Sequence, residues 1–243
     1  MNAAQILVRI VDRPEQAMRG AAERPRSWLL PAVLLILSMI ALAVASAPYA
    51  VPLANERQTQ MIERITQSMS AEQAKTVRSR ARDMTTQRFL LTTVGVAATV
   101  AALGWVGRGA IVHFSGMAAG GMSTWGPTFC VGVWSMLPFF VRDLLQIAYV
   151  LINKGVLEHQ GLGFLVASGD WLKDGRSIVY GALSQVDPFV LWHLVLLAVA
   201  ISVATHLSKA KAVVMAAIVW GLFLGLKLLP VAIGSAVAGR FLG

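Results

Sequence analysis

The sequence predicts an all-α integral membrane protein, a bundle of five transmembrane helices with an extracytoplasmic amphipathic helical arm. Two observations carry this prediction. Hydrophobic residues make up 56% of the 243-residue chain and charged residues only 14%, whereas soluble domains carry about 25% charged residues. Several nearly continuous apolar stretches also reach the roughly 18 to 20 residues that a helix needs to cross the hydrocarbon core.

The leader at residues 1–27 is polar and basic. Its apolar residues follow helical spacing: Ile6, Leu7, Ile10 and Val11. This spacing predicts a short amphipathic helix lying at the membrane surface, on the cytoplasmic side. Because the first apolar run begins only near Trp28 and no convincing cleavage site follows it, we do not expect a cleavable signal peptide.

The first span is expected over residues 28–47 and to end at Pro48 and Pro52. Residues 54–88 then form a polar arm of two amphipathic helices, the second beginning with a capping box at Ser70. The arm carries an apolar stripe made of Met61, Ile65, Met69, Val77 and Met84. It is either a solvated segment or a docking surface for another protein. We favour docking, because a lone polar helix must bury such a stripe against something.

Four further apolar segments complete the predicted membrane domain, which covers residues 28–243. They span residues 89–106, 127–152, 188–207 and 212–233. A glycine-rich connector at 107–126 and a mixed loop at 153–187 separate the middle ones, and Pro230 is expected to kink or end the last. The basic leader and the short turn with Lys209 and Lys211 predict a cytoplasmic N-terminus and, with five spans, an extracytoplasmic C-terminus.

Charged residues inside the predicted spans are the sharpest candidates for function. Arg142 and Asp143 lie about two-thirds along the third span, which also contains Pro138. A charge near the bilayer centre costs several kcal/mol and therefore faces protein, water or a partner charge. Adjacent helical residues point about 100° apart, so we expect each of the two to pair with another span. Alternatively, the span ends at Val141 and both charges lie among the headgroups.

Lys227, deep in the fifth span, is expected to snorkel to the outer interface.

Motifs for packing and chemistry add few further candidates. Gly221 and Gly225 fit the small-xxx-small pattern of close helix contacts, within this chain or with a partner. The sequence contains no P-loop and no HExxH motif, and His193 has no second histidine at metal-ligand spacing. The single cysteine, Cys130, excludes an intramolecular disulfide. We therefore expect no catalytic residue, no cofactor and no metal site. The net charge of +9 is assigned to contacts with lipid headgroups rather than nucleic acid, because the basic residues flank apolar spans.

Four segments of the chain together resemble a known family. They are Arg13-Pro14 with Glu23-Arg24-Pro25-Arg26-Ser27-Trp28, then His113-Phe114-Ser115-Gly116 with Gly120-Gly121, then Val133-Trp134-Ser135-Met136-Leu137-Pro138, and finally Asp187-Pro188-Phe189-Val190-Leu191-Trp192 with Ala204-Thr205 and Lys209-Ala210-Lys211-Ala212. In this order and spacing the chain resembles the Yip domain family, the Ypt/Rab-interacting membrane proteins, in its bacterial branch. The resemblance implies five spans, a cytoplasmic N-terminus and no catalysis, and some bacterial members accompany ABC-type export systems.

Two functional hypotheses follow for a protein of the bacterial plasma (inner) membrane. The first is a non-catalytic accessory or assembly subunit that binds another membrane complex. An ABC-type exporter is the partner implied by the resemblance, and a homo-oligomer is an alternative. The second is a small transporter or channel subunit with a polar path at Arg142, Asp143 and Lys227. Solute flux through liposomes would favour the second hypothesis, and co-purification with a stable partner the first.

Overall fold

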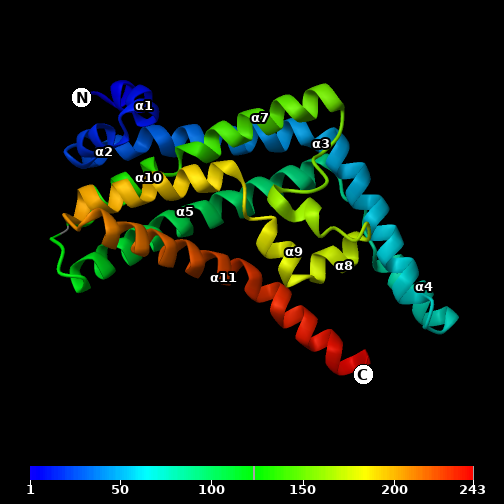
Figure 1. Ribbon diagram of the computed structural model, residues 1–243. Helices are drawn as coiled ribbons and strands as arrows, with labels where there is room; N and C mark the ends of the chain where they lie inside the picture. The colour runs from blue at the N-terminus through cyan, green and yellow to red at the C-terminus, as the bar shows by residue number, and fades with distance from the viewer. Residues whose placement is uncertain (123, 243) are drawn as a thin grey trace. The chain divides into compact units, whose positions relative to one another are not determined.

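The computed structural model describes residues 1–122 and 124–242, with side chains described as far as Gly234, and all regular structure in these residues is helical. Five segments are long and apolar enough to cross a membrane: Pro25–Thr66, Thr86–Ala118, Trp125–Asn153, Pro188–Thr205 and Lys209–Gly234. This confirms the predicted all-α fold with five membrane-spanning segments. Figure 1 shows the order of the helices along the chain.

The chain divides into two compact units. Unit 1 comprises Met1–Ile36, Ala101–Arg142 and Glu158–Gly243, and unit 2 comprises Leu37–Val100 and Asp143–Leu157. Helices α3 (Leu29–Thr66), α5 (Thr86–Ala118) and α7 (Leu137–Asn153) each contribute to both units. Unit 1 holds most of the bundle, whereas unit 2 holds the arm, so each unit is described by itself.

The leader folds into two short helices, α1 (Ala3–Asp12) and α2 (Pro14–Ala22), followed by a 3-10 turn, η1 (Pro25–Trp28). Asn2 and Gln5 form a reciprocal capping box that satisfies backbone N–H groups at the start of α1. Helix α1 packs against α2, and α2 packs against α6 (Trp125–Trp134) and α10 (Pro188–Thr205). Five apolar residues of the leader are fully buried in this cluster, whereas Val8 and Val11 are exposed. The buried residues are Ile6, Ile10, Ala17, Met18 and Ala21. The amphipathic helix predicted at residues 6–11 is present, but protein rather than lipid covers its main apolar face.

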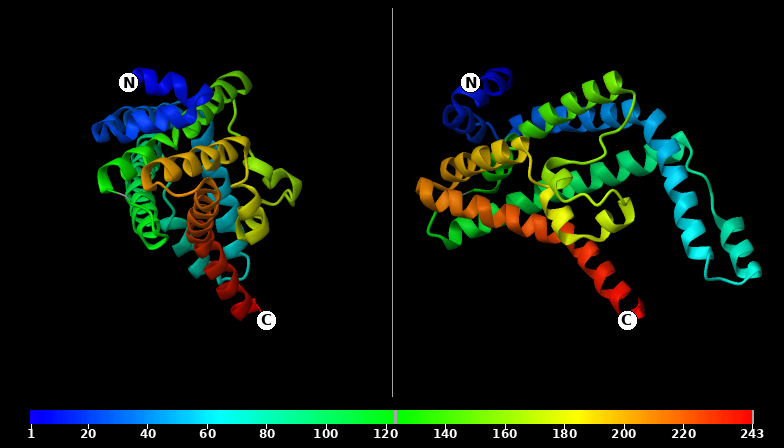
Figure 2. Two further views of the ribbon diagram at one scale, coloured as in Figure 1. Left: turned by 60° about the vertical axis from the view of Figure 1, so that its left-hand side comes forward. Right: turned by 45° about the vertical axis from the view of Figure 1, so that its right-hand side comes forward.

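The centre of unit 1 is the antiparallel pair α10 and α11 (Lys209–Leu242), which lie side by side in both views of Figure 2. Leu197 and Ile201 of α10 pack with Ala212 and Val219 of α11, and Val112 of α5 joins them. Small and branched residues at these contacts bring the helix backbones together, as expected where lipid provides no hydrophobic drive between helices. Helix α11 continues through Pro230, and Figure 1 shows that α11 bends along its length.

The third span, predicted over residues 127–152, consists of two helices, α6 and α7 (Leu137–Asn153), separated by a short break. Pro138 is the physical cause, because a proline has no N–H to donate to the carbonyl four residues earlier. The next amide, of Phe139, bonds the carbonyl of Met136 rather than that of Ser135. The Ser135 carbonyl is thereby released, and it accepts a hydrogen bond from Nδ1 of the buried His193, at 2.8 Å. His193 therefore secures the break in the third span.

The segment predicted as a mixed loop is folded within unit 1. It contains η2 (Gly161–Leu165), α8 (Trp171–Arg176) and α9 (Ile178–Leu183), and α8 and α9 pack against α11. The amide of Leu162 donates to the carbonyl of Val186 at 3.0 Å, and the Tyr180 hydroxyl lies 3.1 Å from Nδ1 of His159. These contacts tie the two ends of the segment to each other just before α10 begins.

Unit 2 contains the arm. The sequence predicts that the first span ends at Pro48 and Pro52. In the structure, helix α3 continues through both prolines to Thr66. Figure 1 shows that α3 changes direction along its length. Helix α4 (Ala71–Arg80) starts at the predicted Ser70 capping box and folds back beside the second half of α3 (Figure 2). The Asn55 side chain bonds both the N–H and the C=O of Met84, at 2.7 and 3.1 Å, and so fixes the returning chain. Helix α4 is thus separate from α5, which begins at Thr86.

Candidate functional site

Arg142 and Asp187 form an ion pair in unit 1, with 3.6 Å between Nη1 of Arg142 and Oδ2 of Asp187. The guanidinium also lies over the ring of Phe139, with its Cζ 4.8 Å from the ring centroid. The other oxygen of Asp187 accepts the amide of Val190 at 2.7 Å and so caps α10. One carboxylate therefore holds the second turn of α7 and the start of α10 together.

The length of α10 indicates how deep this ion pair lies in the membrane. The helix has 18 residues, which correspond to about 27 Å at a rise of 1.5 Å per residue. The hydrocarbon core is about 30 Å thick. If Thr205 lies near one surface, Asp187 and its partner Arg142 lie near the other. Under that premise the ion pair would lie at the headgroups, which is one of the two alternatives that the sequence leaves open for Arg142.

Lys227 belongs to the same electrostatic group. Its ammonium donates to Oε1 of Gln185 at 2.7 Å, and it interacts electrostatically with Arg142, Asp187 and a third cation, Arg108. Arg108 itself stacks over the ring of Phe223, with 4.2 Å from its Cζ to the ring centroid. Three cations and one carboxylate from four elements are therefore gathered in unit 1.

Sequence reasoning missed Arg108 because it placed the end of the second span at Val106. The glycines that follow suggest a connector, whereas α5 runs on to Ala118 and keeps Arg108 well inside the helix. Extending the predicted helix through Gly107 and Gly109 would have placed Arg108 inside it. Such an extension is reasonable, because glycine is tolerated in membrane helices where neighbours pack closely. Gly109 does pack closely: an added Cβ would lie 3.1 Å from the ring of Phe129.

Asp143, the other charged residue of the third span, bonds Ser38 on α3. It lies in unit 2, where it accepts a hydrogen bond from the Ser38 hydroxyl at 2.7 Å, and both side chains are buried. Arg142 and Asp143 therefore have their described partners on two different elements, Asp187 before α10 and Ser38 on α3. This agrees with the roughly 100° between adjacent positions on a helix.

The glycine pair at Gly221 and Gly225 lies on an exposed face of α11 with nothing within 4 Å of a Cβ added at either position. The close helix contact in unit 1 is instead at Gly116 of α5. A Cβ there would lie 2.7 Å from Cγ2 of Thr205 on α10.

A polar cluster that the sequence analysis did not identify anchors the leader to α6. The Sγ of Cys130 lies 3.3 Å from the Ser27 hydroxyl and 3.4 Å from the carbonyl of Ala21. The indole N–H of Trp134 donates to the same hydroxyl at 3.2 Å. Both Cys130 and Trp134 are fully buried. Ser27 therefore links the exit of the leader to two residues one turn apart on α6.

We expect Cys130 to be protected from alkylation as long as the leader stays docked. Met18→Asp places a charge at a fully buried position and should detach the leader, raising the rate of maleimide labelling in detergent at least tenfold. Val8→Asp introduces the same residue at an exposed position of the leader and should leave the rate unchanged. A gel-shift assay with a polyethylene-glycol maleimide measures both rates. Rapid labelling of the unaltered protein would contradict the buried cluster.

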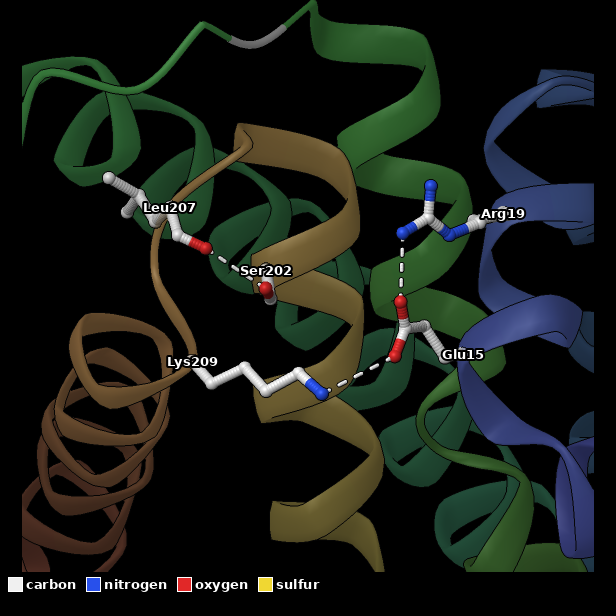
Figure 3. Close-up of polar contacts among 5 residues, drawn as sticks. All are labelled: Glu15, Arg19, Ser202, Leu207 and Lys209. Carbon is white, nitrogen blue, oxygen red and sulfur yellow. Dashed lines mark hydrogen bonds and ion pairs between the residues drawn. The ribbon is translucent and has the colours of Figure 1, made fainter.

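A second link joins the leader to the turn between α10 and α11 (Figure 3). The Glu15 carboxylate accepts from Nη2 of Arg19 at 2.8 Å and pairs with Nζ of Lys209 at 3.6 Å. The hydrogen bond from Arg19 and the charge of Lys209 lower the pKa of Glu15. Its contribution to stability is therefore complete above the ordinary glutamate pKa and is lost as the pH falls through the lowered value. In the same turn, the Ser202 hydroxyl donates to the carbonyl of Leu207 at 2.9 Å.

The arm keeps the stripe that the sequence predicts, and this chain leaves its first half uncovered. Met61, Ile65 and Met69 are 39%, 45% and 38% exposed, whereas Val77 and Met84 are half-buried. The spacing of four residues puts the first two on one face of α3.

Comparison with known proteins gives one match. The chain matches the Yip1 domain over residues 8–229, a range that runs from α1 into α11 and includes the arm, the first four spans and most of the fifth. No curated protein and no solved structure is detectably similar to it. The family resemblance deduced from four short segments is therefore confirmed over nearly the whole chain. This protein belongs to the Yip1 domain family, a family of membrane proteins.

Proposed function

We propose that this protein is a non-catalytic accessory subunit that binds another membrane complex through its arm. The observation that carries the proposal is the exposed stripe Met61–Ile65–Met69. In the leader, Ile6 and Ile10 are fully buried by other residues of unit 1, but Met61, Ile65 and Met69 of the arm have no such cover. A helix with a polar back and an exposed apolar stripe is typical of helix-in-groove recognition.

The composition of the arm favours a protein partner over lipid. Methionine provides two of the three stripe residues, and its flexible, polarizable side chain is common at adaptable binding surfaces. The flanking residues carry both signs of charge, with Glu56 and Glu63 beside Arg57 and Arg64. An interfacial lipid-binding helix would more typically present Lys and Arg alone on its polar face. We therefore expect the arm to remain out of the bilayer, on the extracytoplasmic side.

An ABC-type export complex in the bacterial inner membrane is the partner we consider first, because some bacterial relatives accompany such systems. A permease offers extracytoplasmic helices at the same membrane surface. The arm would contact these helices while the five spans hold the subunit beside the complex. The exposed Gly221 and Gly225 face on α11 supplies a second surface where a partner span, or a second copy of this chain, could approach closely.

The test compares two double variants that change the charge equally. Met61→Glu/Ile65→Glu alters the stripe, and Thr59→Glu/Gln67→Glu alters exposed positions on the other side of the same segment. Tagged proteins are purified from the native membrane in a mild detergent, and the co-purifying proteins are quantified by mass spectrometry. We expect a stoichiometric membrane partner with the unaltered chain and the control, and at least a tenfold loss with the stripe variant, since interface anchors each contribute about 2 kcal/mol or more. Equal recovery from both variants would refute docking through the stripe.

A second function, passage of an anionic solute, is favoured by one observation. Arg108, Arg142 and Lys227 converge in unit 1 with Asp187 as the carboxylate among them. Charges placed within spans are candidates for a solute path. Flux of a small anion through liposomes that contain only the purified protein, abolished by Arg108→Gln, would support this function instead of the accessory role.

A further inference from the structure

Two hollows open on the surface of unit 1 beside the leader, and both are lined by Arg19. One is lined by Arg13, Pro14, Glu15, Gln16 and Arg19 of the leader together with Val199 of α10. The other is bordered by Glu23 and His206 and has Val203 and Ala204 of α10 among its apolar lining. Each hollow thus combines polar groups from the leader with an apolar wall from the last turns of a membrane span.

The charge of the first hollow favours an anion. Arg13 and Arg19 line it, and Lys209 is 3.6 Å from Glu15 in its lining. The opposing carboxylates are Glu15 and Asp12, which lies 3.9 Å from Arg13. The cations exceed the carboxylates by one at neutral pH. Arg19 contacts Glu15 through Nη2, which leaves the other donors of its guanidinium directed elsewhere. Figure 3 shows Lys209 and Arg19 approaching Glu15 from opposite sides, so the carboxylate holds two cations at one place.

An apolar track leads away from this hollow along α10. Leu191, Val195 and Val199 recur every four residues, and Leu191 and Val195 are 56% and 59% exposed. At 1.5 Å per residue the track extends about 12 Å into the span. A ligand with a charged head and a hydrocarbon tail could therefore satisfy the hollow and the track at the same time.

We propose that this hollow is a binding site for an anionic phospholipid, with the phosphate held by Arg13, Arg19 and Lys209 and one acyl chain lying along the Leu191–Val195–Val199 track. Arginine binds phosphate through paired N–H groups, and lysine adds a mobile point charge. A free phosphate would use the same cations but would leave the track without a role. The lipid would connect the leader to the α10–α11 turn, alongside the Glu15 link.

The experiment titrates delipidated, detergent-solubilised protein with defined lipids and follows thermal unfolding. Dioleoyl phosphatidylglycerol is expected to raise the midpoint of unfolding in a saturable manner, whereas dioleoyl phosphatidylcholine and millimolar inorganic phosphate are not. Dihexanoyl phosphatidylglycerol, which has the same head and shorter tails, should bind at least tenfold more weakly. Arg19→Gln/Lys209→Gln should weaken binding of the long-chain lipid at least tenfold.

The matched control is Arg9→Gln/Lys211→Gln, which removes one arginine and one lysine from the same side of unit 1. Arg9 contacts Met1 and Lys211 contacts the carbonyl of Ala119, so neither lies in the Glu15 link. This control should bind phosphatidylglycerol like the unaltered protein. An equal loss of phosphatidylglycerol binding in the control would mean that general surface charge explains the binding, and it would contradict the proposed site. Equal stabilisation by phosphatidylcholine or by inorganic phosphate would overturn the lipid assignment. Circular dichroism at low temperature establishes that both variants are folded.

Discussion

Replacing Gly121 by alanine is expected to destabilise the protein by about 3 kcal/mol, although it adds a single methyl group. The added Cβ would lie 2.5 Å from the carbonyl oxygen of Thr205 and 2.9 Å from that of Gly116. Both are backbone atoms, so no side chain can rotate away. Overpacking alone costs roughly 1–3 kcal/mol, and displacement of the chain would also break backbone hydrogen bonds worth about 1 kcal/mol each.

Of the two hydrogen bonds at risk, one closes the end of α5 and the other joins the residues after α5 to the end of α10. The amide of Gly121 donates to Gly116 at 2.9 Å, and the amide of Met122 donates to Thr205 at 3.1 Å. Gly120 makes the turn possible with a φ of +84°, a conformation that glycine adopts without steric cost. Gly116→Ala acts on the same contact through the Thr205 side chain, at 2.7 Å, and should cost less because a side chain can shift.

Gly132→Ala is the matched control, because Gly132 lies in helix α6 and nothing is within 4 Å of an added Cβ. It should leave stability unchanged or raise it by up to about 1 kcal/mol through the better helix propensity of alanine. Unfolding of the three variants in mixed micelles of increasing sodium dodecyl sulfate, followed by tryptophan fluorescence, ranks them. If Gly121→Ala and Gly132→Ala proved equally stable, the close approach of α5 and α10 would be refuted.

Hydropathy predicts the membrane-spanning segments well, because it estimates the free energy of transferring each window into lipid. It does not say where a helix stops. Helix α3 runs through Pro48 and Pro52 because the neighbouring turns keep their own hydrogen bonds, whereas Pro138 interrupts the third span. The difference lies in tertiary contacts such as that of His193 with the Ser135 carbonyl. No local pattern contains such a contact.

Amphipathic spacing likewise predicts a stripe but not what covers it. The leader and the arm both have apolar residues at helical intervals. In the structure, Ile6 and Ile10 are buried by other helices of unit 1, while Met61 and Ile65 remain exposed. The sequence could indicate that each stripe needs a cover, but the choice among lipid, this chain and a partner depends on contacts between residues far apart in the chain.

For the candidate charged residues too, the sequence indicates which residues are unusual, but only the structure shows their partners. Sequence alone marks Arg142 and Lys227 as unusual for their positions in apolar spans. Their partners Asp187 and Gln185 lie some forty residues away, in a segment that reads as a loop. Arg108 was excluded by a span boundary set too early. Pairing of charges thus required the fold, whereas the presence of unusual charges did not.

Asp187 offers the sharpest test of that pairing, because its two oxygens have separable roles. Asp187→Asn should keep the cap on the Val190 amide and lose the charge pair with Arg142, costing about 1 kcal/mol. Asp187→Ala loses the cap as well, which should add about 1–2 kcal/mol. The difference between the two variants measures the cap, and the same denaturation assay measures both.

Arg142→Gln then isolates the ion pair. In the Arg142→Gln background, Asp187→Asn should lower the free energy of unfolding by less than about 0.5 kcal/mol. The reason is that the guanidinium with which Asp187 pairs is already absent. Ser177→Ala provides a control, since Ser177 caps α9 through the Tyr180 amide and has no role in the pair. Its effect should be the same with and without Arg142→Gln. An undiminished cost of Asp187→Asn in the Arg142→Gln background would mean that Asp187 acts on α10 alone, and that Arg142 is held by its other contacts.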